Sequence, residues 1–256
     1  MNPEAWDARI ARAQVLAEQQ SAAAEILLFY AGIAAIQKSI YEATPPDATF
    51  EMELDKEVVH SHFIVLLSAA EILGPAMLAE AAVEIREAGP ARWESLLSCY
   101  WIASPLEEAD LFFAKAFLEP YAAALADRIV LDPGTPQNSQ CPKCRRKAQV
   151  GVLQAEQDGS KRSLVCSFCA TEWDYRRIVC PACGEQQFGE LAIYTADTMP
   201  HVRVDACESC KSYLLSVDLT KDPEAVPVVD ELASIPLNIW ARQQGYRKLQ
   251  PNLVGL

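Results

Sequence analysis

The sequence contains no apolar run long enough to cross a membrane. Residues 26–36 form a run that is too short, and residues 63–83 are interrupted by Glu71 and Glu80. The first 20 residues carry charges throughout and lack the basic segment followed by an apolar segment that directs a chain to export. We therefore expect a soluble protein that is not secreted.

Catalytic motifs are also missing. The sequence has no nucleophile elbow, no phosphate-binding glycine loop and no zinc-protease motif. Its three histidines do not form a ligand set. His60 and His62 are two residues apart and point away from each other on a helix, while His201 lies in an expected turn, where exposure is the default. We predict that the protein is not an enzyme.

Charge is unevenly distributed along the chain. Residues 1–140 contain 8 Lys and Arg against 21 Asp and Glu, whereas residues 141–256 contain 14 of each. The formal net charge of -13 therefore belongs to the first part. Because nucleic-acid surfaces need clustered basic residues, a nucleic-acid partner is not expected there.

Eight of the nine cysteines form four Cys-x-x-Cys pairs. The pairs are Cys141/Cys144, Cys166/Cys169, Cys180/Cys183 and Cys207/Cys210. Each Cys-x-x-Cys turn directs two sulfurs at one centre, so a soft tetrahedral ion needs two such turns. We predict two metal ions per chain, iron or zinc, since both accept four thiolates. A site closed by four sulfurs leaves no open position for a substrate.

The spacing of the pairs predicts which of them share an ion. The first and second pairs are separated by 21 residues, the third and fourth by 23, and the second and third by only 10. Site 1 is therefore predicted to contain Cys141, Cys144, Cys166 and Cys169, and site 2 to contain Cys180, Cys183, Cys207 and Cys210. An interleaved pairing of first with third and second with fourth is an alternative. Disulfides and redox-active Cys-x-x-Cys turns are further alternatives.

The apolar pattern predicts an α+β fold. Helical spacing runs through residues 4–130, whereas residues 132–139 are dense in turn formers and residues 148–219 alternate as strands do. The predicted organisation is an all-α domain at 1–132, a linker at 133–140, a first four-cysteine metal-binding module at 141–179, a second at 180–220 and a helical tail at 221–256. The β modules are too small to fold without their ions.

Several residues predict where elements begin and end. Ser104, Pro105 and Glu107 have the spacing of a helix cap, and Pro120 and Pro236 each predict a break in a helix. In the first module, strands are expected at 148–154 and 162–165 around a turn at Asp158 and Gly159, and another over 173–179. The second module is expected to contain strands at 191–195, 202–204 and 213–219.

The residues that flank the cysteines form distinctive stretches. They are Cys166-Ser-Phe-Cys169-Ala-Thr-Glu-Trp173, Arg177-Ile-Val-Cys180-Pro-Ala-Cys183-Gly184, Cys207-Glu-Ser-Cys210-Lys-Ser-Tyr213 and, in the tail, Asp230-Glu-Leu-Ala-Ser. In these stretches the chain resembles the FdhE family of formate dehydrogenase accessory proteins. One departure is Arg145, where the family usually has glycine. Because glycine accepts positive φ without penalty, we expect strain or a different turn there.

The resemblance implies a cytoplasmic protein with a helical N-terminal domain and two rubredoxin-like, or zinc-ribbon, modules. It implies a non-enzymatic role in the maturation of a respiratory formate dehydrogenase, whose catalytic subunit would be the partner. Two other functions stay open. One is a rubredoxin-like electron carrier, and the other is a zinc-ribbon nucleic-acid-binding protein.

Overall fold

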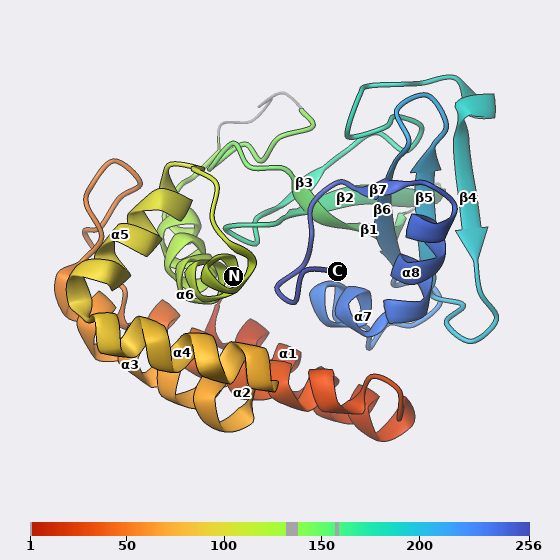
Figure 1. Ribbon diagram of the computed structural model, residues 1–256. Helices are drawn as coiled ribbons and strands as arrows, with labels where there is room; N and C mark the ends of the chain where they lie inside the picture. The colour runs from red at the N-terminus through yellow and green to blue at the C-terminus, as the bar shows by residue number, and fades with distance from the viewer. Residues whose placement is uncertain (1, 132–137, 157–158) are drawn as a thin grey trace. The chain divides into compact units, whose positions relative to one another are not determined.

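The computed structural model describes residues 2–131, 138–156 and 159–256, and the chain divides into two compact units, Met1–Ile129 and Val130–Val254 (Figure 1). Residues 133–137 of the predicted linker and Asp158 of the predicted turn lie outside the described residues. Within the described part, no helix combines the length and the apolar character that a membrane span requires.

The first unit is all-helical. Its helices are α1 (Pro3–Gln19), α2 (Ala24–Ala43), α3 (Lys56–Leu73), α4 (Ala76–Ala88), α5 (Pro90–Trp101) and α6 (Glu108–Asp127). The break between α3 and α4 falls at Gly74 and Pro75, because proline disfavours helical backbone at the residue before it. The core of the unit contains a buried ion pair, with 3.2 Å between Arg9 Nη1 and Glu119 Oε1.

The predicted start of the last helix of this unit is wrong. Ser104 does not cap α6 but belongs to the end of α5. Its N–H donates to the Cys99 carbonyl (2.8 Å). Ala103 has a φ of 62°, which turns the chain out of the helix. Helix α6 starts four residues after Ser104, with Glu107 in extended conformation as its N-cap.

The predicted break at Pro120 is also wrong, since α6 runs through it. Proline has no N–H, so the Ala116 carbonyl one turn earlier loses its helical donor. The buried side chain of Gln37, on α2, donates to that carbonyl from 3.0 Å. A neighbouring helix thus satisfies the group that proline leaves unpaired, and α6 continues.

The second unit contains one mixed sheet. Its strands are β1 (Ala148–Glu156), β2 (Gly159–Cys166), β3 (Glu172–Asp174), β4 (Leu191–Thr195), β5 (Val202–Cys207), β6 (Ser212–Asp218) and β7 (Arg247–Lys248). The order is β3-β2-β1-β6-β5-β4, with β7 also paired to β6. β1 and β6 run parallel, so the strands of both predicted modules belong to the same sheet. The limits of the modules, 141–179 and 180–220, remain predictions.

The strand predicted over residues 173–179 is shorter than expected. It ends at Asp174, because the backbone carbonyls that follow pair with a side chain instead of a strand. Arg162 Nη1 donates to the carbonyls of Arg177 and Val179 at 3.3 Å and 3.2 Å. The guanidinium thus takes the place of a neighbouring strand.

Two short helices, α7 (Pro227–Ala233) and α8 (Ile235–Gln243), pack on the sheet beside β1, β5, β6 and β7. The predicted break before Pro236 is confirmed, since Ser234 separates the helices and the proline lies in the first turn of α8. The Tyr213 hydroxyl, on β6, donates to Asn238 Oδ1 of α8 (2.9 Å). The predicted α+β class, with helices first and the cysteine hairpins after them, is confirmed.

Candidate metal centres

Each Cys-x-x-Cys pair lies on a tight turn with left-handed backbone directly after its second cysteine. The residues in that position have φ values of 64° at Arg145, 52° at Ala170, 81° at Gly184 and 53° at Lys211. Of the two expectations at Arg145, strain is confirmed by its positive φ, and a different turn is wrong. The same turn forms with and without glycine, and the non-glycine residues accept the steric cost of positive φ.

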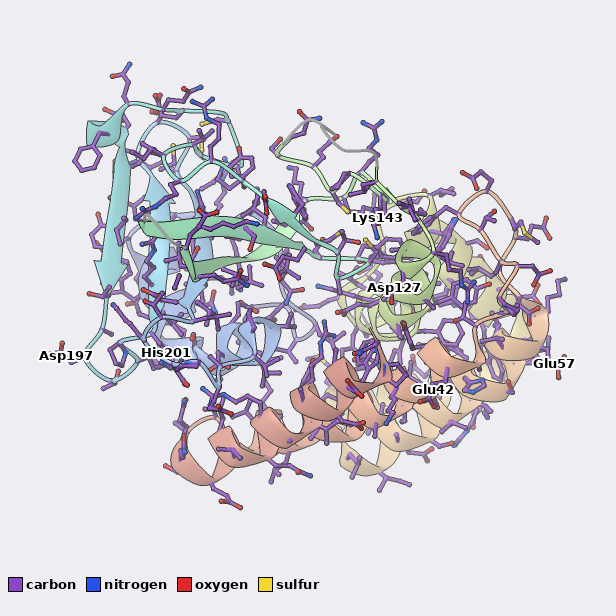
Figure 2. The ribbon with its side chains drawn as sticks, turned by 180° about the vertical axis from the view of Figure 1, so that it is seen from behind. Glu42, Glu57, Asp127, Lys143, Asp197 and His201 are labelled. Carbon is purple, nitrogen blue, oxygen red and sulfur yellow. The ribbon has the colours of Figure 1, made fainter. Side chains whose placement is uncertain are left out.

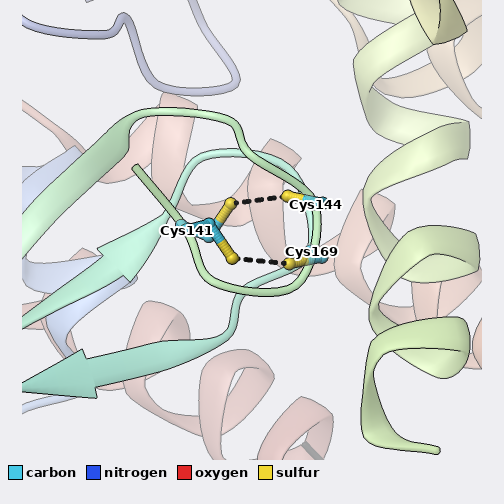
Figure 3. A group of neighbouring side chains, drawn as sticks. Cys141, Cys144 and Cys169 are labelled. Carbon is cyan, nitrogen blue, oxygen red and sulfur yellow. Dashed lines mark hydrogen bonds between the residues drawn. The ribbon is translucent and has the colours of Figure 1, made fainter. Parts of the chain in front are cut away.

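The turns bring the eight sulfurs into two clusters. In the first, the Sγ atoms of Cys141 and Cys169 are 3.5 Å apart, and those of Cys144 and Cys166 are 3.3 Å apart (Figure 3). Within each cluster, all four sulfurs lie within 4.8 Å of one another. The geometry groups the first pair with the second and the third with the fourth.

The second cluster has the same cross-connected arrangement. Cys180 and Cys210 have sulfurs 3.8 Å apart, and those of Cys183 and Cys207 are 3.7 Å apart. A tetrahedron of sulfurs around an ion with bonds of about 2.3 Å has edges of about 3.8 Å. Each cluster can therefore hold one metal ion, which fits two ions per chain, iron or zinc.

The surroundings of the sulfurs act on them in opposite directions. Backbone N–H groups donate to sulfur within the turns, from Phe168 to Cys166 (3.4 Å) and from Ala182 to Cys180 (3.3 Å). Contacts with the neighbouring thiols lower the pKa of Cys141, whereas burial raises that of Cys166. Four thiolates at this distance repel one another, so a cation is needed to hold them together.

The two clusters differ in exposure. In the first, Cys144 is partly buried and the other three cysteines are buried, whereas in the second Cys183 is exposed to solvent. Burial raises the pKa of the Cys210 thiol, but hydrogen bonds from the side chain and backbone of Ser212 outweigh this and bring it to about 7. The second cluster is thus the one with a sulfur at the protein surface.

A partly buried charged cluster lies near the second set of cysteines and was not predicted. Asp205 Oδ2 is 3.2 Å from Arg162 Nη2, and its Oδ1 is 2.8 Å from Arg203 Nε. Ser216 Oγ donates to the same carboxylate (2.7 Å). Arg162 comes from β2 and Asp205 from β5, so the cluster connects the two cysteine hairpins. The only sequence signal is an arginine in an alternating strand.

The exposure predicted for His201 is wrong. Its Nε2 lies 2.9 Å from the buried carboxylate of Asp230, at the start of α7, and Asp222 is close to both. Figure 2 shows His201 near Asp197 at the end of the β4–β5 hairpin. Asp230 Oδ2 also accepts the N–H of Val226 (2.8 Å). These contacts attach the hairpin to α7.

Comparison with known proteins finds a similarity to one family. Residues 140–177 match the family described as FdhE, central domain, and residues 178–254 match FdhE, C-terminal domain. The two matches are contiguous and contain both cysteine clusters. Over residues 140–254 the chain is similar to the FdhE family.

Individual FdhE proteins support this. The FdhE homologue of Aquifex aeolicus is 28% identical over 204 residues, covering 79% of this chain and 72% of the relative. The homologue of Pseudomonas aeruginosa is 33% identical over 125 residues, covering 47% of this chain and 40% of the relative. Escherichia coli K12 FdhE is 29% identical over 192 residues, and the match covers 71% of this chain and 60% of that protein.

A crystal structure shares the fold. The FdhE protein from Pseudomonas aeruginosa superposes with a TM-score of 0.74 at 24% identity, covering 99% of this chain and 96% of that one. The similarity extends over the helical unit, which the two family descriptions do not reach.

Proposed function

We propose that this chain is a cytoplasmic accessory protein that binds the catalytic subunit of a respiratory formate dehydrogenase during its maturation. The similarity of residues 140–254 to FdhE domains, and of the chain to FdhE proteins, supports the proposal. The closed four-sulfur clusters agree with a role that is not catalytic, because four protein ligands leave no coordination position for a substrate.

We also propose that one ion is held by Cys141, Cys144, Cys166 and Cys169, and the other by Cys180, Cys183, Cys207 and Cys210. The sulfur distances support these ligand sets. Bound there, the ions would supply structural cross-links between loops that have little core of their own. The knuckle N–H groups and the left-handed residues then hold the sulfurs in place.

Co-purification tests the proposed partner. The affinity-tagged chain is expressed in a host that carries its own formate dehydrogenase genes, and the bound proteins are identified by mass spectrometry together with the metals. The catalytic subunit is expected among them, and it should be absent when a tagged protein of similar net charge replaces the chain. If the subunit is never recovered, and if deleting the chain leaves formate dehydrogenase activity unchanged, the proposal is wrong.

A rubredoxin-like electron carrier is the second candidate. The exposure of Cys183 favours it, since electron transfer needs a site near the surface. This function requires iron, so protein purified without oxygen should be coloured and should bleach reversibly on reduction. A colourless protein that contains only zinc excludes it.

A further inference from the structure

The outer strand of the sheet, β4, has an unprotected edge. It is the last strand of the order, and among the described residues no strand pairs with its far side (Figure 1). Its sequence, Leu-Ala-Ile-Tyr-Thr, contains no charge and no proline, and its pairing with β5 has no bulge. Natural edge strands usually carry such features because free N–H and C=O groups attract other strands.

The opposite edge of the sheet is protected in the usual way. β3 has only three residues, and two of them are Glu172 and Asp174. Asp174 pairs with Lys161 on the neighbouring strand. The contrast within one sheet indicates that the open edge of β4 is a specific feature rather than a general property of the fold.

An apolar pocket lies beside this edge. It is formed on the face opposite α8 by β4, β5, β6 and the turn that contains Cys180, and its volume is about 70 Å³, on the scale of one aliphatic side chain. Three apolar side chains at the pocket are exposed: Phe188 by 80%, Ile193 by 55% and Ile178 by 51%. Exposed apolar groups gathered around a hollow are typical of a binding surface.

The pocket also has a positive charge at its margin that makes no ion pair among the described residues. Arg162 and Arg203 share the carboxylate of Asp205. Arg177, which is exposed and lines the pocket, makes no ion pair within the described residues. A partner with a carboxylate near its apolar side chain would complement this charge.

We infer that β4 and the adjacent pocket bind an extended segment of a partner protein, which adds a strand to the free edge, inserts one apolar side chain into the pocket and places a carboxylate near Arg177. Strand addition uses the main-chain groups of β4 for affinity and the pocket for specificity. A second copy of this chain fits less well. Two-fold pairing would set β4 against a second β4, which offers no carboxylate for Arg177.

The inference deepens the proposed function and rests on it only for the identity of the partner. Its test therefore uses peptides. A library of random 12-residue peptides displayed on phage is selected on the full-length, metal-loaded chain. Selected peptides should have apolar residues at alternate positions and an Asp or Glu, and the synthetic peptides should bind with micromolar affinity.

Variants locate the binding. Ile193→Lys is expected to weaken binding at least tenfold, and Phe188→Ala and Arg177→Glu severalfold. Ile72→Lys makes the same substitution at an exposed isoleucine of α3, in the other unit, and as the control it should change nothing. A peptide whose acidic residue is replaced by lysine should bind Arg177→Glu better than the wild type. Metal content and circular dichroism verify that each variant is folded.

Three results overturn the inference. One is that no peptide is enriched, and another is that enriched peptides bind Ile193→Lys as tightly as wild type. The third is that wild-type protein sediments as a dimer that Ile193→Lys converts to a monomer, which assigns the edge to a second copy. The peptide test does not use the catalytic subunit. Its result is therefore independent of the co-purification experiment, and the two proposals can fail separately.

Discussion

Val150 on β1 lies opposite Leu215 on β6 in parallel register, and both side chains are buried. This pair belongs to the seam at which the first cysteine hairpin meets the second. Gly151 is the next residue of the seam, opposite Ser216. A Cβ added to Gly151 would lie 2.2 Å from Ser216 Oγ, so the close approach of the strands requires glycine.

A double-mutant cycle tests the seam. We expect Gly151→Ala to destabilise the protein by about 1–3 kcal/mol, because overpacking forces the strands apart. Ser216→Ala alone should cost about 1 kcal/mol through its lost hydrogen bond to Asp205. Together they should cost less than the sum, since the colliding oxygen is gone. Urea unfolding of the four proteins measures this, and strict additivity would contradict the contact.

Cysteine pairs can be removed one cluster at a time. We expect Cys180→Ser with Cys183→Ser to leave one ion per chain and most of the helical circular dichroism, because the other sulfurs stay together. Replacing Cys166, Cys169, Cys180 and Cys183 should leave none. Cys99→Ser, outside both clusters, is the control and should retain two ions. Elemental analysis that finds one full equivalent in the fourfold variant would contradict the ligand sets.

A chelator should remove the two ions in order. The second cluster exposes Cys183, so an attacking ligand reaches it first, whereas the first cluster has no sulfur exposed to that degree. Metal release followed with a chromophoric chelator should show two phases of equal amplitude. The Cys180→Ser, Cys183→Ser variant should lack the fast phase. Loss of the slow phase instead would reverse the assignment.

The side chain of Gln37 should matter only because of Pro120. Gln37→Leu leaves the Ala116 carbonyl unpaired, and we expect a loss of about 1–3 kcal/mol in the free energy of unfolding. In a Pro120→Ala background the restored N–H reaches that carbonyl along the helix, so the same change should cost much less. Thermal unfolding of the four combinations provides the measurement. An equal cost in both backgrounds would show that Gln37 acts in another way.

Alkaline pH should weaken the contact between β6 and α8. Burial raises the pKa of Tyr213 from 10.0 to about 12. The folded state therefore favours the protonated phenol, so the stability it contributes is complete below about pH 10 and is lost as the pH rises towards 12. Tyr213→Phe lacks this titration. The advantage of wild type over Tyr213→Phe in urea should shrink between pH 10 and 12, and a constant difference would contradict the shift.

The sequence predicts what depends on local spacing. Cys-x-x-Cys pairs specify their turns, and the separations of 21 and 23 residues leave room for a hairpin within each site, which favours the grouping that the structure reproduces. Prediction from the sequence fails where a residue distant in the chain determines the local structure. Pro120 predicts a break, because the residues near it give no sign that Gln37 will pair with the Ala116 carbonyl. The alternating pattern predicts that β1 and β6 are strands, but it does not predict that they pair with each other. Asp205 likewise has a distant partner, Arg162 of β2, that its own strand does not reveal.

The parallel seam also sets an order of events during synthesis. The sulfurs of Cys141 and Cys169 are 28 residues apart, so the first cluster can close soon after its hairpin is made. The seam instead joins Val150 to Leu215, which is 65 residues later in the chain. Contacts of such separation form late, because a long loop must close first. The nascent chain can therefore complete its first cluster before β6 is available to pair with β1. Until that pairing forms, the first cysteine hairpin is held only by its own turns.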